Sequence, residues 1–219
     1  ARAREVIAAL DWHAAAQPAP AAPRPPRNDP AELIGLMPAN FREPVDMREI
    51  IARIVDDSAF LPFRPDHGPA TLCGHARLDG HAIGIVTNNG PLDPPGAAKA
   101  AMFVQLCCQS ATPILWLQNT TGFIVGRASE EAGMIKHGAK LIQALTNATV
   151  PQVTLMCGAS FGAGNYGMCG RAFRPRFLFA WPNSVTAVMG AEQAARTMEI
   201  VARAQAERRG VAPDEAKLA

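Results

Sequence analysis

The sequence predicts an α/β fold, and three observations support this prediction. Short apolar runs between residues 71 and 188 have the length and composition of strands. Several of them are separated by longer segments whose apolar residues recur with a helical period of about 3.6 residues. Hydrophobic residues make up 48% of the 219 residues, which is enough for one substantial core. Strands that alternate with helices in this way form crossover units of a sheet with parallel strands.

The N-terminal quarter is predicted to be less regular. Residues 2–10 resemble a short helix, and residues 17–30 contain six prolines, which favour an extended, semi-rigid chain and exclude a helix or a central strand. We therefore expect residues 17–40 to form a proline-rich linker. The next segment, residues 45–60, has its apolar residues near a helical period and is predicted to be a helix.

The remaining elements follow in a regular order. The dipeptide Asp79-Gly80 predicts a hairpin between strands at residues 71–78 and 81–87. Further helices are expected at residues 97–109, at 130–146, from about Gly162, and at 191–208. Further strands are expected at residues 114–117, 153–157, 177–180 and 186–188.

Composition excludes several classes of function. A formal charge of +2 from scattered Lys and Arg gives no basic face for nucleic acid. The five cysteines are odd in number and lack CxxC spacing, which argues against a zinc site or a disulfide framework and favours a reducing compartment. No apolar run is long enough to span a membrane, and the first residues lack the apolar centre of a signal peptide. We expect a cytoplasmic protein, and the abrupt start suggests a piece of a longer polypeptide.

Three junctions between a strand and a helix carry the residues of interest: residues 88–101, 118–126 and 157–170. The third junction combines Gly158, Gly162, Gly164 and Gly167 with small neighbours, so a ligand oxygen can approach main-chain N–H groups. N–H groups at a helix start have no partner within the helix, and two such groups can form an oxyanion hole. A close packing contact between elements explains the glycines equally well.

Other chemistries do not match these junctions. The glycine spacing is not that of a dinucleotide loop, and Ser160 does not lie in the G-x-S-x-G context of a hydrolase nucleophile. The histidines show no metal spacing. In the second junction, Phe123 lies between Gly122 and Gly126, where its ring either stacks on a planar ligand or packs in the core.

With these residues in view, the sequence resembles the carboxyltransferase (beta) subunits of biotin-dependent acyl-CoA carboxylases. The matching stretches cover most of residues 41–209. They are NNGPLDPPGAAKA, QLCCQSATPILWLQNTTGFIVG, GMIKHGAKLI, ATVPQVTLMCGASFGAGNYGMCGRAFRPRFLFAWPN and VMGAEQAA. The run SFGAGNYGMCGR is specific to the branch that acts on 3-methylcrotonyl-CoA and geranyl-CoA, in leucine and terpene catabolism.

The resemblance implies a crotonase-like fold of repeated ββα units. It also implies that residues 1–16 are the remnant of an upstream N-terminal carboxyltransferase domain, which binds acyl-CoA. Residues 41–219 correspond to the C-terminal domain, which binds carboxybiotin carried on the partner (alpha) subunit. Relatives form homo-oligomers, and their active site lies between an N-terminal and a C-terminal domain.

Carried over by motif, Phe123 and Ala163 provide the backbone N–H groups that face the biotin ureido oxygen. Thr121, Gly122, Gly162 and Gly164 shape this cofactor site, and no metal or side-chain base is needed. Two alternatives stay open: a crotonase-like enzyme that acts directly on acyl-CoA, and a non-catalytic remnant that only assembles with carboxylase subunits. The first needs a carboxylate pair on the glycine turns, and residues 157–170 contain neither Asp nor Glu. Without the upstream domain, we expect the chain alone not to complete the reaction.

Overall fold

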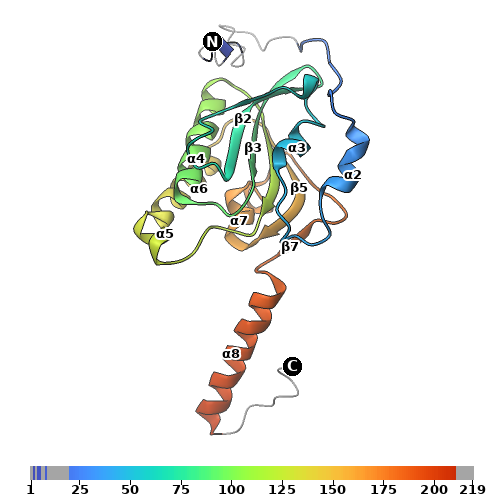
Figure 1. Ribbon diagram of the computed structural model, residues 1–219. Coiled ribbons are helices and arrows are strands. Elements are labelled where there is room, and N and C mark those ends of the chain that lie inside the picture. The colour runs from blue at the N-terminus through green and yellow to red at the C-terminus, as the bar shows by residue number, and fades with distance from the viewer. Residues whose placement is uncertain (1, 3, 6–7, 9–19, 211–219) are drawn as a thin grey trace.

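A seven-stranded mixed sheet with helices on both faces forms the body of the protein (Figure 1). The computed structural model describes residues 2, 4, 5, 8 and 20–210. The strand order is β1-β2-β3-β4-β5-β6, and β7 pairs with β5 beyond the end of the β6 contact. The pairs β1–β2 and β2–β3 are antiparallel, whereas all later pairs are parallel. The strands are β1 (Phe60–Pro62), β2 (Thr71–Leu78), β3 (His81–Asn88), β4 (Ile114–Thr120), β5 (Gln152–Phe161), β6 (Phe177–Ala180) and β7 (Val185–Ala187).

The predicted hairpin is confirmed, and the helix predicted before it is wrong. Strands β2 and β3 pair in register from Thr71 with Asn88 to Leu78 with His81. Within residues 45–60, only Met47–Ile51 forms an α-helix, α3, and a short 3-10 helix follows at Asp56–Ser58. The chain then turns so that the buried Asp56 accepts hydrogen bonds from the N–H groups of Asp79 (2.9 Å) and Gly80 (2.8 Å). Asp56 thus fastens the hairpin turn, and this contact takes the place of the predicted helix.

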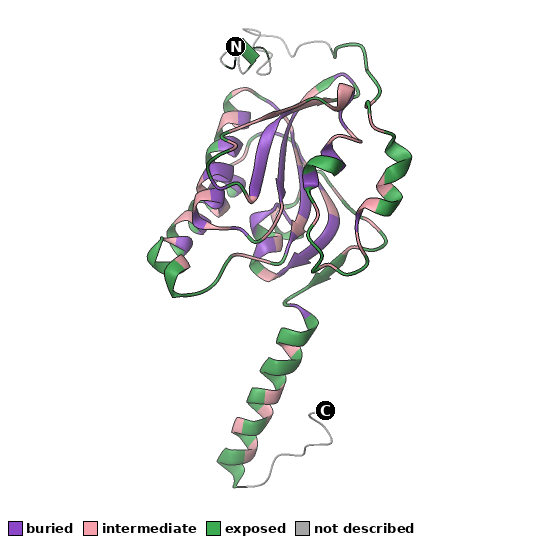
Figure 2. Ribbon diagram, viewed as in Figure 1, coloured by how far each residue is buried: buried purple, intermediate pink, exposed green. Residues whose placement is uncertain are grey.

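Helices α4 (Pro94–Gln109) and α6 (Met134–Thr146) cover one face of the sheet, as predicted for residues 97–109 and most of 130–146. The side chain of Asp93 caps α4 by accepting from Gly96 N–H at 2.7 Å. The predicted helix at residues 130–146 is two helices, because Gly133 has a φ of 86° and separates α5 (Arg127–Glu131) from α6. The buried residues between these helices and the sheet form the larger core (Figure 2).

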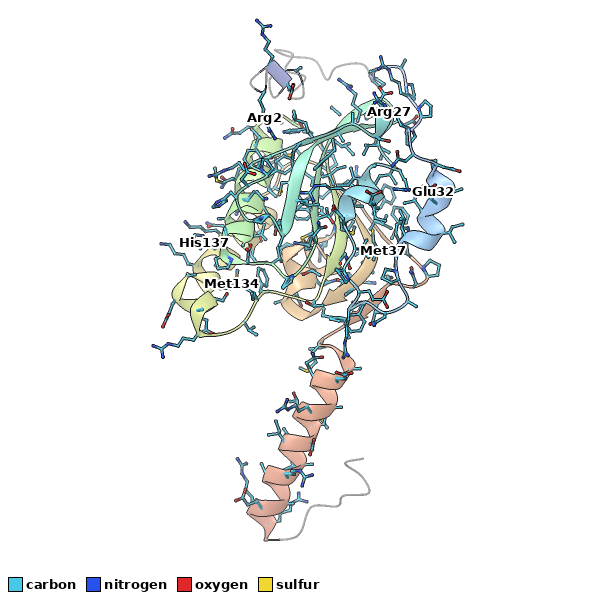
Figure 3. The ribbon with its side chains drawn as sticks, viewed as in Figure 1. Arg2, Arg27, Glu32, Met37, Met134 and His137 are labelled. Carbon is cyan, nitrogen blue, oxygen red and sulfur yellow. The ribbon has the colours of Figure 1, made fainter. Side chains whose placement is uncertain are left out.

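The opposite face is covered by α3, by α2 (Leu33–Leu36) and by the segment before it. Met37 is buried against the sheet in this second core (Figure 3). The described part of the proline-rich segment also follows the body, where Ala21 N–H donates to Gly80 O (3.0 Å) and Arg24 pairs with Asp57 (2.8 Å). It is extended up to a short 3-10 helix, η1 (Pro30–Glu32). The helix predicted at residues 2–10 lies largely outside the described residues, and the boundaries at residues 16 and 40 stay predictions.

The C-terminal elements follow the predicted order. Strand β5 runs on to Phe161, so that α7 (Gly162–Gly167) begins immediately at its end. Two short 3-10 helices, η2 (Asp56–Ser58) and η3 (Arg171–Phe173), complete the body. The last helix, α8 (Ala191–Arg209), buries none of its residues and projects from the body (Figures 1 and 2). In the described part of the chain, no helix is both long and apolar enough to cross a membrane.

Candidate functional site

The three junctions predicted from the sequence meet at one edge of the sheet. Strands β3, β4 and β5 are parallel neighbours, and each junction contains the last residues of one of them. Leu92 of the first junction donates its N–H to Gly122 O (2.9 Å) and accepts from Ile124 N–H (2.9 Å) in the second. The second and third junctions touch as well, because a Cβ placed on Gly164 would lie 2.7 Å from Gly122 Cα. The structure therefore joins segments that are far apart in sequence.

The contact with Leu92 orients the peptide groups of Phe123. Leu92 forms a parallel bridge with Phe123 and bonds the residues on either side of it. In such a bridge, the N–H and C=O of the bracketed residue point away from the partner segment. The Phe123 N–H forms no hydrogen bond with any described residue. It is thus a free donor on an exposed turn, beside the exposed Thr121.

The ring of Phe123 has a different role from its N–H. A Cβ on Gly167 would lie 2.7 Å from the Phe123 Cζ, and one on Gly138 would lie 3.4 Å from its Cε1. The ring is therefore held between α6 and α7 and packs against the larger core. Of the two alternatives left open by the sequence, the structure supports a core phenylalanine, and the ring is not free to lie flat on a ligand.

The third junction presents the N–H of Ala163. Gly162 has a φ of 47°, and a Cβ at this position would lie 2.6 Å from the carbonyl oxygen of Val188, so only glycine fits. Ala163 is the second residue of α7 and is exposed. The first N–H groups of a helix have no partner within that helix. No described residue outside the helix accepts from the Ala163 N–H either, so it is a second free donor.

Backbone contact between the two turns places these donors on adjoining segments. The Cβ position of Gly164 lies 3.1 Å from Gly122 N and 3.1 Å from Thr120 Cγ2, in addition to the close approach to Gly122 Cα. Gly122 itself has a φ of 135° and has open space on its Cβ side. Two N–H groups on adjoining turns can together bind an oxygen that carries partial negative charge. The glycines therefore fit both interpretations of the sequence: they allow the two turns to pack closely, and they leave N–H groups accessible to bind an oxygen.

Three polar residues behind these turns were not predicted from the sequence. Gln118 near the end of β4, Ser160 near the end of β5 and Asn165 in α7 form a hydrogen-bonded cluster. Gln118 and Ser160 have no exposed surface. A polar residue that continues the apolar strand Ile114–Leu117 must find a partner when it is buried, and this position was the available indication.

Ionisable side chains near the turns are not arranged for nucleophilic or metal chemistry. Burial raises the pKa of the Cys157 thiol to about 12 and that of Cys169 to about 11, so both thiols are neutral at pH 7. Among the residues that the structure describes, no three His, Cys, Asp or Glu side chains are grouped to hold a metal ion. The chemistry available at this edge is therefore that of main-chain N–H groups.

Comparison with known proteins places these features in a family. The family described as "Carboxyl transferase domain" matches residues 1–219. A probable biotin-dependent acyl-coenzyme A carboxylase beta2 subunit of Mycobacterium tuberculosis is 51% identical over 214 residues, which are 97% of this chain and 40% of that protein. A probable mitochondrial methylcrotonoyl-CoA carboxylase beta chain of Drosophila melanogaster is 50% identical over 87% of this chain and 33% of its own length.

Solved structures agree with this result. The beta subunit of geranyl-CoA carboxylase from P. aeruginosa is 55% identical, with a TM-score of 0.80 over 91% of this chain and 38% of that one. The transcarboxylase 12S structure, at 31% identity, has a TM-score of 0.83 over 90% of this chain and 39% of that one. The predicted crotonase-like α/β fold is confirmed. The chain spans about two fifths of the length of these relatives or less.

Proposed function

The chain belongs to the carboxyl transferase domain family, and on that premise we propose that it is the carboxybiotin-binding part of the carboxyltransferase (beta) subunit of a biotin-dependent acyl-CoA carboxylase. The enzyme is a ligase that forms C–C bonds by transferring CO2 from carboxybiotin to an acyl-CoA. One observation carries the proposal. Phe123 and Ala163 each present an unpartnered N–H on adjoining turns at the carboxyl ends of β4 and β5.

The residues at this edge fit the ureido group of biotin. The ureido oxygen is a carbonyl acceptor with two lone pairs, and it matches two N–H donors without needing a charged side chain. Gly122 has no atom within 4 Å of its Cβ position, which leaves this side of the turn open to a planar ring. Gly162 and Gly164 keep the opposite turn close, and Thr121 and Ala163 are exposed beside it.

Carboxybiotin, when bound, supplies an activated carboxyl group. The Phe123 and Ala163 N–H groups would donate to the ureido oxygen and stabilise the negative charge that grows there in the transition state. Loss of one such donor typically costs roughly 3 kcal/mol, or a factor of about 10² to 10³ in rate. The turns supply no side-chain base, because residues 157–170 contain no Asp or Glu and their thiols are neutral.

The substrate and partners are part of the same proposal. The acyl group is branched and unsaturated, as in geranyl-CoA or 3-methylcrotonyl-CoA, which is supported by 55% identity to a geranyl-CoA carboxylase beta subunit and 50% to a methylcrotonoyl-CoA carboxylase beta chain. We propose that biotin is carried on a biotin carboxylase/biotin carrier (alpha) subunit and that the beta subunits form a homo-oligomer. Of the alternatives, nothing in the structure or the comparisons favours a crotonase-like enzyme of another type or a non-catalytic remnant.

The chain is proposed to divide into the same three segments that the sequence predicts. Residues 41–219 form the carboxybiotin-binding domain, residues 17–40 connect to it, and residues 1–16 belong to an upstream domain. A cytoplasmic location is also proposed, supported by five cysteines that are all free, as in a reducing compartment.

Substitution Ala163→Pro tests the proposed donor, because proline has no N–H. The second position of a helix tolerates proline, and the preceding Gly162 has no Cβ for the proline ring to meet. In a beta subunit of full family length, assayed with its biotin-carrying partner, carboxyl transfer should fall about 100-fold or more. The control Ala163→Gly keeps the N–H and should retain activity. Full transfer activity in a folded Ala163→Pro subunit would show that the donor assignment is wrong.

A further inference from the structure

Behind the two turns lies a cluster of three polar side chains, the fully buried Gln118 and Ser160 and the half-buried Asn165. We propose that these are positioning residues, which set the placement of the Ala163 peptide against the Phe123 peptide. The inference rests on the proposed function, since it concerns how the donors of that site are held. None of the three needs to touch the ligand.

The hydrogen bonds of the cluster join three elements. Ser160 Oγ, at the end of β5, donates to Gln118 Oε1 of β4 at 2.5 Å. Asn165 Nδ2, in α7, donates to Ser160 Oγ at 2.8 Å and to Gln118 Oε1 at 3.3 Å. Gln118 Nε2 donates back to the carbonyl oxygens of Met168 (2.7 Å) and Asn165 (3.4 Å). Both ends of the Gln118 amide are used, so its orientation is determined by its partners.

Helix α7 needs such a support. It has six residues, Gly162–Gly167, and a helix of this length is not stable without tertiary contacts. Gln118 Nε2 donates to the carbonyl oxygens of Asn165, in the last turn of α7, and of Met168, the C-cap residue. The last carbonyl groups of a helix have no N–H partner within that helix, so such donors stabilise its end. Asn165 ties the middle of the helix to the strand that precedes it. The direction of the Ala163 N–H therefore depends on these side chains.

The same strand leads to the second donor. Two residues after Gln118, the buried Thr120 accepts from Gly122 N–H through its Oγ1 (3.3 Å) and donates from Oγ1 toward Gly122 O (3.3 Å). Its Cγ2 lies 3.1 Å from the Cβ position of Gly164, on the far turn. Strand β4 thus holds the Phe123 turn directly and the Ala163 turn through Gln118. One continuous set of contacts fixes both donors.

The polar character of the cluster indicates that one particular arrangement of β4, β5 and α7 is required. Gln118 and Ser160 are fully buried, and a buried polar group without partners costs about 1–3 kcal/mol. Apolar side chains would fill this space without that risk, whereas directional hydrogen bonds select one arrangement of the strands and the helix. A cluster that only stabilised the fold would not need to join the strand that leads to one donor turn with the helix that carries the other.

A double-mutant cycle distinguishes positioning from general stabilisation. In the beta subunit of full family length with its biotin-carrying partner, Ser160→Ala should lower kcat about 10- to 100-fold, since a donor displaced by about 1 Å loses up to about 100-fold in rate. KM for acyl-CoA should stay within about twofold, because the proposed function places the acyl-CoA site on the upstream domain. In an Ala163→Pro background, Ser160→Ala should add less than about twofold, because the donor it positions is already absent.

Controls keep the outcomes separate. Ser110→Ala removes a half-buried hydroxyl that bonds Thr112 Oγ1 (2.8 Å) and Leu106 O (3.0 Å) before β4 begins, and it should reduce stability without changing kcat. If Ser160→Ala does not fold, Asn165→Ala replaces it, because Asn165 is only half-buried. Equal losses of kcat from Ser160→Ala in both backgrounds, or no loss in either, would overturn the positioning role while Ala163→Pro remains impaired. An active Ala163→Pro subunit would instead overturn the proposed donor.

Discussion

The contact between Gly122 and Gly164 predicts the effect of adding one methyl group. We consider Gly164→Ala, which places a Cβ 2.7 Å from Gly122 Cα and 3.1 Å from Gly122 N. Two carbon atoms in contact prefer a separation of about 3.5–4.0 Å. The neighbour is backbone, which cannot swing aside as a long side chain can. The two donor turns must therefore move apart by about 1 Å.

The free-energy cost combines two opposing effects. Overpacking of a close contact typically costs about 1–3 kcal/mol. Alanine stabilises a helix interior relative to glycine by roughly 1 kcal/mol, and Gly164 lies inside α7. The expected net loss of folding stability is therefore about 0–2 kcal/mol. A 1 Å displacement of a catalytic group, in contrast, can reduce the rate about 100-fold. Gly164→Ala should impair transfer far more than it impairs folding.

Two measurements test this difference. Urea unfolding of the 219-residue chain gives the stability change, and carboxyl transfer by a beta subunit of full family length gives the rate. The matched control is Gly35→Ala, which also lies in a helix, α2, and has no atom within 4 Å of its Cβ position. It should leave the rate unchanged and stability equal or slightly higher. Transfer by Gly164→Ala within about twofold of the parent would refute the close-contact reasoning.

Two further predictions follow from burial. Of the five thiols, only that of Cys108 is partly exposed. A thiol reagent should therefore modify one group per folded chain quickly and all five after unfolding. Rapid reaction of two or more thiols in the folded chain would contradict this prediction. Burial beside Phe103 lowers the pKa of His75, so the unfolded chain takes up a proton below about pH 6.5 while the folded chain resists it. The unfolding free energy should be highest above that pH and should fall on acidification by up to about 1.4 kcal/mol per pH unit, whereas His75→Leu should weaken this dependence. Urea titration between pH 7.5 and 5.5, about the range in which an unperturbed His titrates, measures both chains. Equal slopes in the two chains would refute the assignment.

Local chemistry explains which elements could be predicted from the sequence. The hairpin of β2 and β3 is determined by a two-residue turn, and both strands were predicted almost to their ends. Residues 45–60 were not, because the apolar period there matches a helix while the Asp56 carboxylate bonds a turn more than twenty residues away. The break at Gly133 was missed for a related reason, since a glycine within an apolar helical pattern does not reveal its φ. Tertiary contacts decide such positions.

In the candidate site, too, local features could be predicted from the sequence and tertiary contacts could not. Its glycine turns lie in contiguous sequence, so their potential to expose N–H groups was recognisable before the fold was known. The meeting of Gly122 with Gly164 depends on the order of strands in the sheet, and the cluster around Gln118 depends on side-chain directions from three elements. No local pattern encodes either of them. The ring of Phe123 could not be placed from the sequence, because its contacts with Gly138 and Gly167 come from two other helices.

Strands β4 and β5 are parallel neighbours, and the spacing between them determines how far apart the two halves of the proposed site begin. Adjacent strands in any sheet are separated by about 4.8 Å, a length fixed by main-chain hydrogen bonds and not by side chains. Phe123 follows the end of β4 by three residues, and Ala163 follows the end of β5 by two. The ends of the two strands therefore bring the donor turns to about one strand spacing from each other, and the cluster of Gln118, Ser160 and Asn165 sets the placement of the donors within that spacing. Under the proposed function, the two donors to the ureido oxygen start from a spacing that side-chain substitutions around this edge do not change.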